Sequence, residues 1–225
     1  MEDLAARYPE RLKELVELWD SEAERHQVFP LDDRNLERMP FSYFLEPRNS
    51  WVFEQGMARV SGYAAPTISD RSYRIIADIE IAAGTQGVIL SVGGCAGGYV
   101  MFVDQGRLVH EYIGPKRRWT VESLDTLPLG RHELRFDFRK TGRCMGIATL
   151  LVDGSEIGRI QMEDTWPFGP TAGGVCCGYD DASPLSDRYA QPFTFTGRIH
   201  RVTVVIDDDY CADPALANHI ALSED

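Results

Sequence analysis

Apolar and polar residues alternate with a period of two along much of the chain after residue 50, and this pattern constrains the fold more than any other feature. In residues 132–139 one face of an extended chain carries His132, Leu134, Phe136 and Phe138. The opposite face carries Glu133, Arg135, Asp137 and Arg139. A period of two is the spacing of a β-strand, and one charged face indicates an antiparallel strand with a solvated side.

Similar runs predict further strands, and short turn motifs separate them. The predicted ranges are 75–81, 86–93, 98–104, 106–113, 117–122, 147–153, 155–162, 173–178 and 198–206. Asp153-Gly154 and Asp104-Gln105-Gly106 are typical of hairpin turns. About ten short strands without intervening helices predict an antiparallel sandwich or barrel over residues 51–206.

The segment before the predicted strands has a different period. Residues 9–26 are predicted to form one amphipathic helix, whose apolar stripe is Leu12, Leu15, Val16, Trp19 and Ala23. An apolar stripe must be buried on another surface, so we expect docking on a partner through Leu12, Leu15, Val16 and Trp19. Three prolines interrupt the following residues, and residues 1–50 are therefore predicted to be this helix and a proline-rich linker.

The charge of the chain limits its partners. The 225 residues have a formal net charge of −12. Residues 1–40 carry 11 acidic and 6 basic side chains, and residues 207–225 carry 6 acidic and no basic ones, which predicts an acidic C-terminal tail. Nucleic-acid binding requires a basic face and is not expected. Neither a signal-peptide pattern nor a membrane-spanning run occurs, so we expect a cytoplasmic chain without a membrane partner.

Several longer motifs occur in one order over most of the chain. They are ARVSGYAAPTISDRSYRIIADIEI (58–81), GVILSVGGCAGGYVMFVDQGRLVHEY (87–112), LPLGRHELRFDF (127–138), ATLLVDGSEIGRI (148–160) and CGYDDASPLSDRYAQPFTFTGRIHRVTV (177–204). Together with residues 3–34 they resemble the C-terminal region of large bacterial arylsulfatases. That region comprises the last helix of the catalytic domain and the β-sandwich that follows it.

This resemblance implies a fold and a role. The fold it implies is mostly β: a concanavalin A-like lectin/glucanase jelly roll of two antiparallel sheets with one N-terminal helix. The catalytic pattern [CS]-x-P-x-R is missing from the sequence, so the chain alone is predicted not to be an enzyme. The resemblance implies a non-catalytic accessory domain that packs on a sulfatase catalytic domain or self-associates.

The alternative is a lectin-like domain that binds carbohydrate, including sulfated glycans. The dense basic cluster Lys116-Arg117-Arg118 precedes Trp119. An aromatic ring is able to stack on a sugar, and arginines bind sulfate, so the predicted site is Tyr112, Arg117, Arg118 and Trp119. A solvated hairpin whose tryptophan packs inward explains the same residues.

Other chemistry has less support in the sequence. No cofactor is expected, although carboxylates on a tight loop at Asp180 and Asp181 are able to hold calcium as an alternative to capping their own turn. Asp78 and Glu80 lie two residues apart on one strand, but they are interpreted as solvated charges rather than a hydrolase pair. His132 falls on an apolar face and is interpreted as a core histidine.

Overall fold

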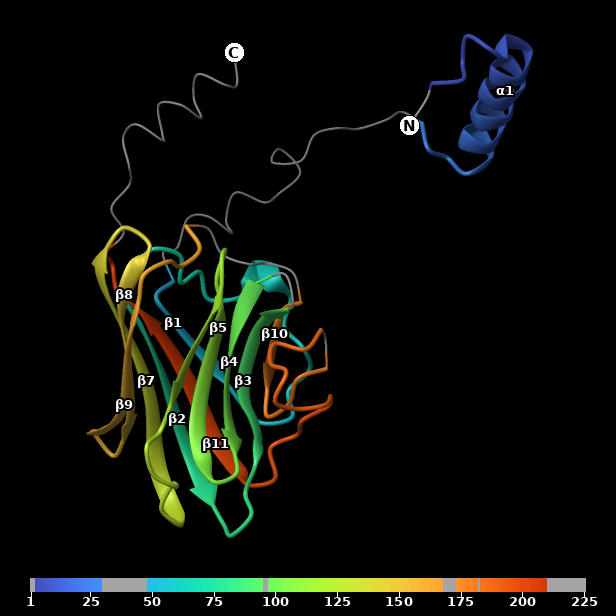
Figure 1. The fold of residues 1–225 in the computed structure, drawn as a ribbon. Helices are drawn as coiled ribbons and strands as arrows, with labels where there is room; N and C mark the ends of the chain where they lie inside the picture. Colours follow the sequence, from blue (N-terminus) through green and yellow to red (C-terminus); the bar gives the residue numbers. More distant parts are fainter. Residues whose placement is uncertain (1–2, 30–47, 95–96, 168–172, 182, 210–225) are drawn as a thin grey trace. The chain divides into compact units, whose positions relative to one another are not determined.

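A computed structural model describes residues 3–29, 48–94, 97–167, 173–181 and 183–209. The chain divides into two compact units, residues 1–47 and residues 48–225, and each is described by itself (Figure 1). The proline-rich linker falls mostly on residues 30–47, and most of the predicted tail falls on residues 210–225. Both stretches lie outside the described residues.

The first unit contains helix α1, Pro9–Arg25. Pro9 occupies the first turn, where its missing N–H costs no intrahelical hydrogen bond. Ala23 is the buried residue of this helix, whereas Leu12, Leu15, Val16 and Trp19 are each about half exposed. In the part of the chain that the structure describes, no helix combines the length and apolarity needed to cross a membrane.

The second unit consists of two antiparallel sheets. The six-stranded sheet has the order β1 (Ser50–Phe53), β11 (Arg198–Ile206), β2 (Tyr73–Ile81), β7 (Gly130–Gly142), β8 (Met145–Val152) and β9 (Ser155–Met162). The five-stranded sheet has the order β10 (Val175–Cys177), β3 (Gly87–Gly94), β4 (Gly97–Asp104), β5 (Arg107–Ile113) and β6 (Arg118–Glu122). A short 3-10 helix, η2, covers Gly62–Ala64.

The connections make this pair of sheets a jelly-roll sandwich (Figure 1). The chain crosses between the sheets from β2 to β3, from β6 to β7, and through β10 on the way from β9 to β11. The predicted fold class, mostly β with two antiparallel sheets and one N-terminal helix, is confirmed. Both predicted hairpin turns are present, with the left-handed pairs Gln105-Gly106 and Asp153-Gly154 at their tips.

Alternate residues of every long strand face the core between the sheets. From the six-stranded sheet these include Ile75, Ala77, Leu134 and Phe136, and from the five-stranded sheet Tyr99, Met101, Leu108 and Tyr112. His110 of β5 is also in this core, 1% exposed, with its ring stacked on Phe136 at 3.6 Å between centroids. Its Nε2 atom has no hydrogen-bond partner among the described residues.

The outer faces of the two sheets differ. Leu185, Tyr189 and Phe193 pack on the outer face of the five-stranded sheet, over Val88, Val100, Phe102 and Val109. Arg188, in the same segment, forms an ion pair with Glu122 at 2.6 Å. The outer face of the six-stranded sheet instead carries half-buried or exposed charged side chains on β2, β7 and β11. The accessible sheet surface is therefore that of the six-stranded sheet.

Candidate binding site

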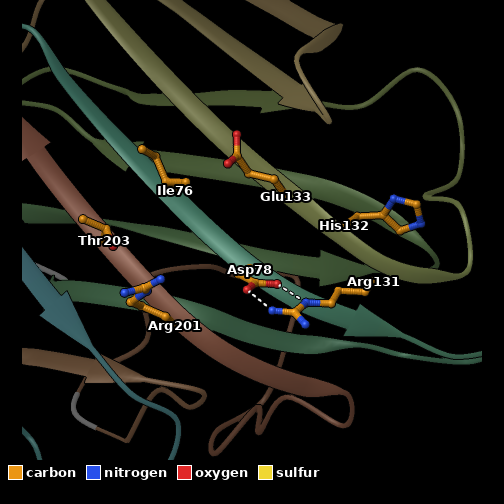
Figure 2. Close-up of a pocket in the computed structure, with 7 residues that line it drawn as sticks. All are labelled: Ile76, Asp78, Arg131, His132, Glu133, Arg201 and Thr203. Carbon is orange, nitrogen blue, oxygen red and sulfur yellow. Dashed lines mark hydrogen bonds and ion pairs between the residues drawn. The ribbon is translucent and has the colours of Figure 1, made fainter.

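A shallow depression of about 400 Å³ lies on the outer face of the six-stranded sheet. Three adjacent strands line it: β11, β2 and β7. Its lining residues are Ile76, Asp78, Arg131, His132, Glu133, Arg201 and Thr203 (Figure 2). Five of these seven side chains are ionisable, so the depression is a polar site.

Strand register explains why these side chains meet. Asp78 of β2 is directly opposite Glu133 of β7 on one side and Arg201 of β11 on the other. Neighbouring strands lie about 4.8 Å apart, so the backbone positions of Arg201 and Glu133 are about 10 Å apart across the sheet. Ile76 and Thr203 form the next opposed pair on the same face, because side chains two residues apart share a face.

Asp78 and Arg131 form an ion pair at the centre of the depression. Arg131 donates two hydrogen bonds to the carboxylate, from Nε to Oδ1 at 2.8 Å and from a terminal nitrogen to Oδ2 at 2.6 Å (Figure 2). This bidentate pairing lowers the pKa of Asp78, and the hydrogen bond from Arg131 is the largest cause. Asp78 is therefore an ionised acceptor near neutral pH and not a proton donor.

Three lining side chains have no hydrogen-bond or ion-pair partner within the described part of the chain. Among the described residues, Arg201, Glu133 and Thr203 form no side-chain hydrogen bond or ion pair. Arg201 and Glu133 are exposed, and Thr203 is half-buried. A guanidinium that donates, a carboxylate that accepts and a hydroxyl that does both therefore face the same depression, and all three are available to a ligand.

His132 lies at the end of the depression and not in the core. Its Nδ1 is 2.6 Å from Oδ2 of Asp153, and its Nε2 is 3.1 Å from the carbonyl oxygen of Leu129. The interpretation of His132 as a core histidine is therefore wrong, because its ring is partly exposed and turns to the Asp153 carboxylate and the Leu129 carbonyl. Ile79, directly opposite it on β2, is nevertheless buried. The histidine in the core is His110. The bond to Asp153 is the largest cause that raises the pKa of His132, followed by the Leu129 carbonyl.

We expect His132 to titrate above its ordinary value of 6.5, because both ring nitrogens face acceptors that favour the protonated form. In an NMR titration, Asp153→Asn should lower the pKa of His132 by removing the charged partner. The matched control is Asp187→Asn, which removes a carboxylate that pairs with Arg118. This control should leave the pKa of His132 unchanged. A pKa at or below 6.5 in the unmodified protein would contradict this assignment.

The structure separates the residues predicted from sequence to bind a glycan. Tyr112 is 3% exposed, and its hydroxyl accepts a hydrogen bond from the backbone N–H of Trp166 at 2.9 Å. The prediction that Tyr112 contacts a ligand is therefore wrong, because the alternation of β5 directs its ring into the core. Arg118 forms ion pairs with Glu111 at 3.3 Å and Asp187 at 3.0 Å.

Trp119 and Arg117 form a stacked pair beside Asp164. The indole nitrogen of Trp119 donates to the backbone oxygen and to Oδ1 of Asp164 at 2.9 and 2.8 Å. The guanidinium of Arg117 lies over the indole, 5.0 Å from the ring centroid. An external ring would have to displace Arg117 to stack on that face. Ligand binding by Arg117, Arg118 and Trp119 stays a prediction.

The two carboxylates considered for calcium have separate partners. Asp180 is buried and accepts hydrogen bonds from the Tyr189 hydroxyl at 2.7 Å and from the Leu185 backbone N–H at 3.4 Å. Asp181 forms an ion pair with Arg59 at 3.3 Å. Across the described ranges, no group of three or more histidine, cysteine or acidic side chains is arranged to hold a metal ion. Calcium at this loop stays a prediction.

Asp78 and Glu80 share the outer face, as the alternation predicts. They are opposite Glu133 and Arg131, respectively, on β7. Glu80 is 2.9 Å from Nε2 of His200. Sequence reasoning did not group Asp78 with Arg201 and Thr203, because β2 and β11 are separated by more than 100 residues. Only the pairing of these strands places them together, and a single sequence carries no signal for that pairing.

Comparison with known proteins finds distant structural likenesses only. No family model and no curated protein match the chain. Domains LG4-5 of the mouse laminin alpha1 chain match with a TM-score of 0.47 and 13% identity, over 72% of this chain and 42% of that chain. The Caenorhabditis elegans galectin LEC-6 matches with a TM-score of 0.40 and 11% identity, over 71% of this chain and 98% of the galectin.

A carbohydrate-binding module, CBM66 from Bacillus subtilis, matches with a TM-score of 0.34 and 9% identity, over 72% of this chain and 81% of the module. Likeness of this degree does not extend to a ligand or an activity. None of these matches supports the resemblance to arylsulfatases, which stays a prediction from the sequence.

Proposed function

We propose that this chain is a non-catalytic domain that binds a glycan in the depression on the six-stranded sheet. The observation that carries the proposal is a set of three side chains that have no hydrogen-bond or ion-pair partner among the described residues, Arg201, Glu133 and Thr203, around the doubly hydrogen-bonded Asp78–Arg131 pair. Pre-organised polar groups lose little conformational entropy when a ligand binds, so such a pair favours binding.

The chemistry of the lining suits a polyhydroxylated ligand. Each sugar hydroxyl both donates and accepts hydrogen bonds. Glu133 accepts them, Arg201 donates them, and Thr203 does both. A hydrogen bond that involves a charged group is worth about 1.5–3 kcal/mol, so these few contacts are enough for selective binding. The volume of about 400 Å³ is in the range of small-molecule sites, and the shallow shape admits an extended chain.

The same residues argue against hydrolysis in the depression. Glycoside hydrolysis requires one carboxylic acid with a raised pKa to protonate the leaving group. The pKa of Asp78 is lowered by Arg131, and Asp78 is engaged by that arginine through both oxygens. A carboxylate held in this way is suited to positioning a ligand and not to proton transfer.

An array of neutral and acidic glycans tests the proposal, followed by calorimetry on the best ligand. We expect Glu133→Ala and Thr203→Val together to weaken binding at least tenfold, because two acceptors of ligand hydroxyls are lost. Glu156→Ala removes an exposed carboxylate on β9 of the same sheet, outside the depression, and should leave the affinity unchanged. An array without a bound glycan, or an affinity that both changes leave intact, would overturn the proposal.

A second function predicted from the sequence is docking of helix α1 on another protein. The observation that favours it is the half-exposed apolar stripe of Leu12, Leu15, Val16 and Trp19. Its expected partner is a sulfatase catalytic domain, with self-association as the alternative. Gel filtration of the chain alone, and mixed with a sulfatase domain lacking its own sandwich, tests both. Elution as a monomer in each case, at micromolar concentration, would contradict this function.

A further inference from the structure

Resting on the proposed glycan function, we infer that the ligand carries an anionic group, a carboxylate or a sulfate ester, and that Arg201 binds it. The depression would then select acidic glycans over neutral ones. The juxtaposition that carries this inference is Arg201 at one side of the depression and Glu133 at the other, neither of which forms a side-chain hydrogen bond or ion pair with the residues that the structure describes.

Among the described residues of this face, Arg201 is the arginine that both lines the depression and forms no ion pair; Arg139 and Arg198 also form none, but they do not line it. Four other arginines of this face pair with acidic residues: Arg74 with Asp207, Arg131 with Asp78, Arg135 with Asp137, and Arg159 with Glu156. Arg201 is opposite Asp78, and its charge helps to lower the pKa of that carboxylate, but the hydrogen bonds to Asp78 among the described residues come from Arg131. Among the described residues, Arg201 therefore lines the depression with its donors unused.

The geometry of a guanidinium favours an oxyanion in this position. Its planar fork donates two parallel hydrogen bonds to a carboxylate or a sulfate, and such charge-assisted bonds are about twice as strong as neutral ones. A sugar hydroxyl accepts from only one of these donors at a time. An acidic glycan therefore gains more from Arg201 than a neutral glycan of the same shape.

The opposite end of the depression fixes the direction of the ligand. The Glu133 carboxylate repels an anion and accepts hydrogen bonds from hydroxyl groups. The backbone positions of Glu133 and Arg201 are about 10 Å apart, a separation close to one Debye length at physiological ionic strength. The acidic group is therefore placed over β11, beside Thr203, and the neutral hydroxyls are placed over β7. His132, at the end of the depression beside Glu133, contributes positive charge when protonated.

Heparin tetrasaccharides with defined chemical changes test the inference by calorimetry. The three probes are the native form, the desulfated and N-acetylated form, and that second form with its carboxylates reduced. We expect the uncharged probe to bind at least tenfold more weakly than one of the acidic probes. The first two probes show whether sulfate or carboxylate is recognised. Binding of the acidic probe should weaken as the salt concentration rises.

Substitutions of Arg201 identify the residue responsible. Arg201→Gln should remove the difference between acidic and neutral probes, and Arg201→Lys should retain part of it, because charge remains while the planar fork is lost. Arg139→Gln removes an exposed arginine of β7 that does not line the depression, and should leave the difference intact.

The outcomes separate the two proposals. Equal affinity for charged and uncharged probes, or neutral glycans bound on the array while the acidic probe is rejected, overturns the acidic ligand and leaves glycan binding standing. A difference that survives Arg201→Gln overturns the role of Arg201. Failure of every array glycan and every probe to bind overturns the glycan function and this inference with it.

Discussion

Acidification from pH 6.5 towards pH 3 is expected to destabilise this fold by several kcal/mol through His110 alone. Burial in the core lowers the pKa of His110 from 6.5 to about 3. Between these values the unfolded chain binds a proton that the folded chain does not. Stability is therefore complete above pH 6.5 and falls as the pH decreases, by about 1.4 kcal/mol per pH unit.

The surroundings of His110 explain the size of this effect. Its ring stacks on Phe136 from the opposite sheet and lies 6.0 Å from the Tyr99 ring centroid. No carboxylate forms a hydrogen bond or an ion pair with the ring among the described residues, and Nε2 has no partner there. A charged imidazolium in the core would lose its hydration and gain no ion pair or hydrogen bond in return, so burial disfavours the protonated form.

Urea unfolding of the unmodified protein and of His110→Leu, at pH 7 and at about pH 4, measures this contribution. Leucine does not titrate, so the variant should lose about 3 kcal/mol less than the unmodified protein over this interval. His26→Gln, in the separate N-terminal unit, is the control and should follow the unmodified protein. Equal acid sensitivity of His110→Leu and the unmodified protein would show that His110 is not the group responsible.

Substitution of Lys140 by methionine is expected to cost about 3–5 kcal/mol, because it leaves a buried carboxylate without its counter-ion. The Nζ atom of Lys140 donates to Oδ2 and to the backbone oxygen of Asp70, both at 2.9 Å. The side chains of Lys140 and Asp70 are only 12% and 8% exposed. Asp70 also accepts a hydrogen bond from the backbone N–H of Cys144 at 2.7 Å, so it joins the β7–β8 turn to the segment before β2.

The double variant Asp70→Asn with Lys140→Met should recover part of the lost stability, because the remaining amide is uncharged and still accepts from Cys144. The midpoint of denaturant unfolding at a constant m-value measures each change. Lys116→Met, at an exposed lysine, should change stability by less than about 0.5 kcal/mol. A loss below about 1 kcal/mol for Lys140→Met would contradict a buried, mutually dependent pair.

The strands and hairpins were predictable because their signals are local. Alternation fixes which residues of β7 face the core, and a two-residue turn such as Asp153-Gly154 joins adjacent strands in a known geometry. The helix over Pro9–Arg25 was predictable for the same reason, since its stripe repeats every three to four residues. The pairing of β11 with both β1 and β2 carries no such local signal.

The candidate site was less predictable, because it depends on those distant pairings. Asp78 was identified as an outward carboxylate, but its meeting with Arg131, Arg201 and Glu133 required the register of three strands. Tyr112 was assigned to a surface site because it lies close to Trp119 in the sequence. The two residues are directly paired across β5 and β6, and the ring of Tyr112 is buried.

The sequence by itself determined ten of the eleven described strands to within three residues, the two hairpin turns, the amphipathic helix and the sandwich class, because each depends on contacts within a few residues. The short strand β1 was not predicted. Only the tertiary structure decided that His110 lies in the core while His132 lies at its edge. The tertiary structure also placed residues 185–193 over one sheet and left a charged depression on the other. Alternation states which face of its strand a side chain occupies. The alternation does not show which strand pairs with that strand or which segment covers that face. Both depend on contacts between residues that are far apart in the chain.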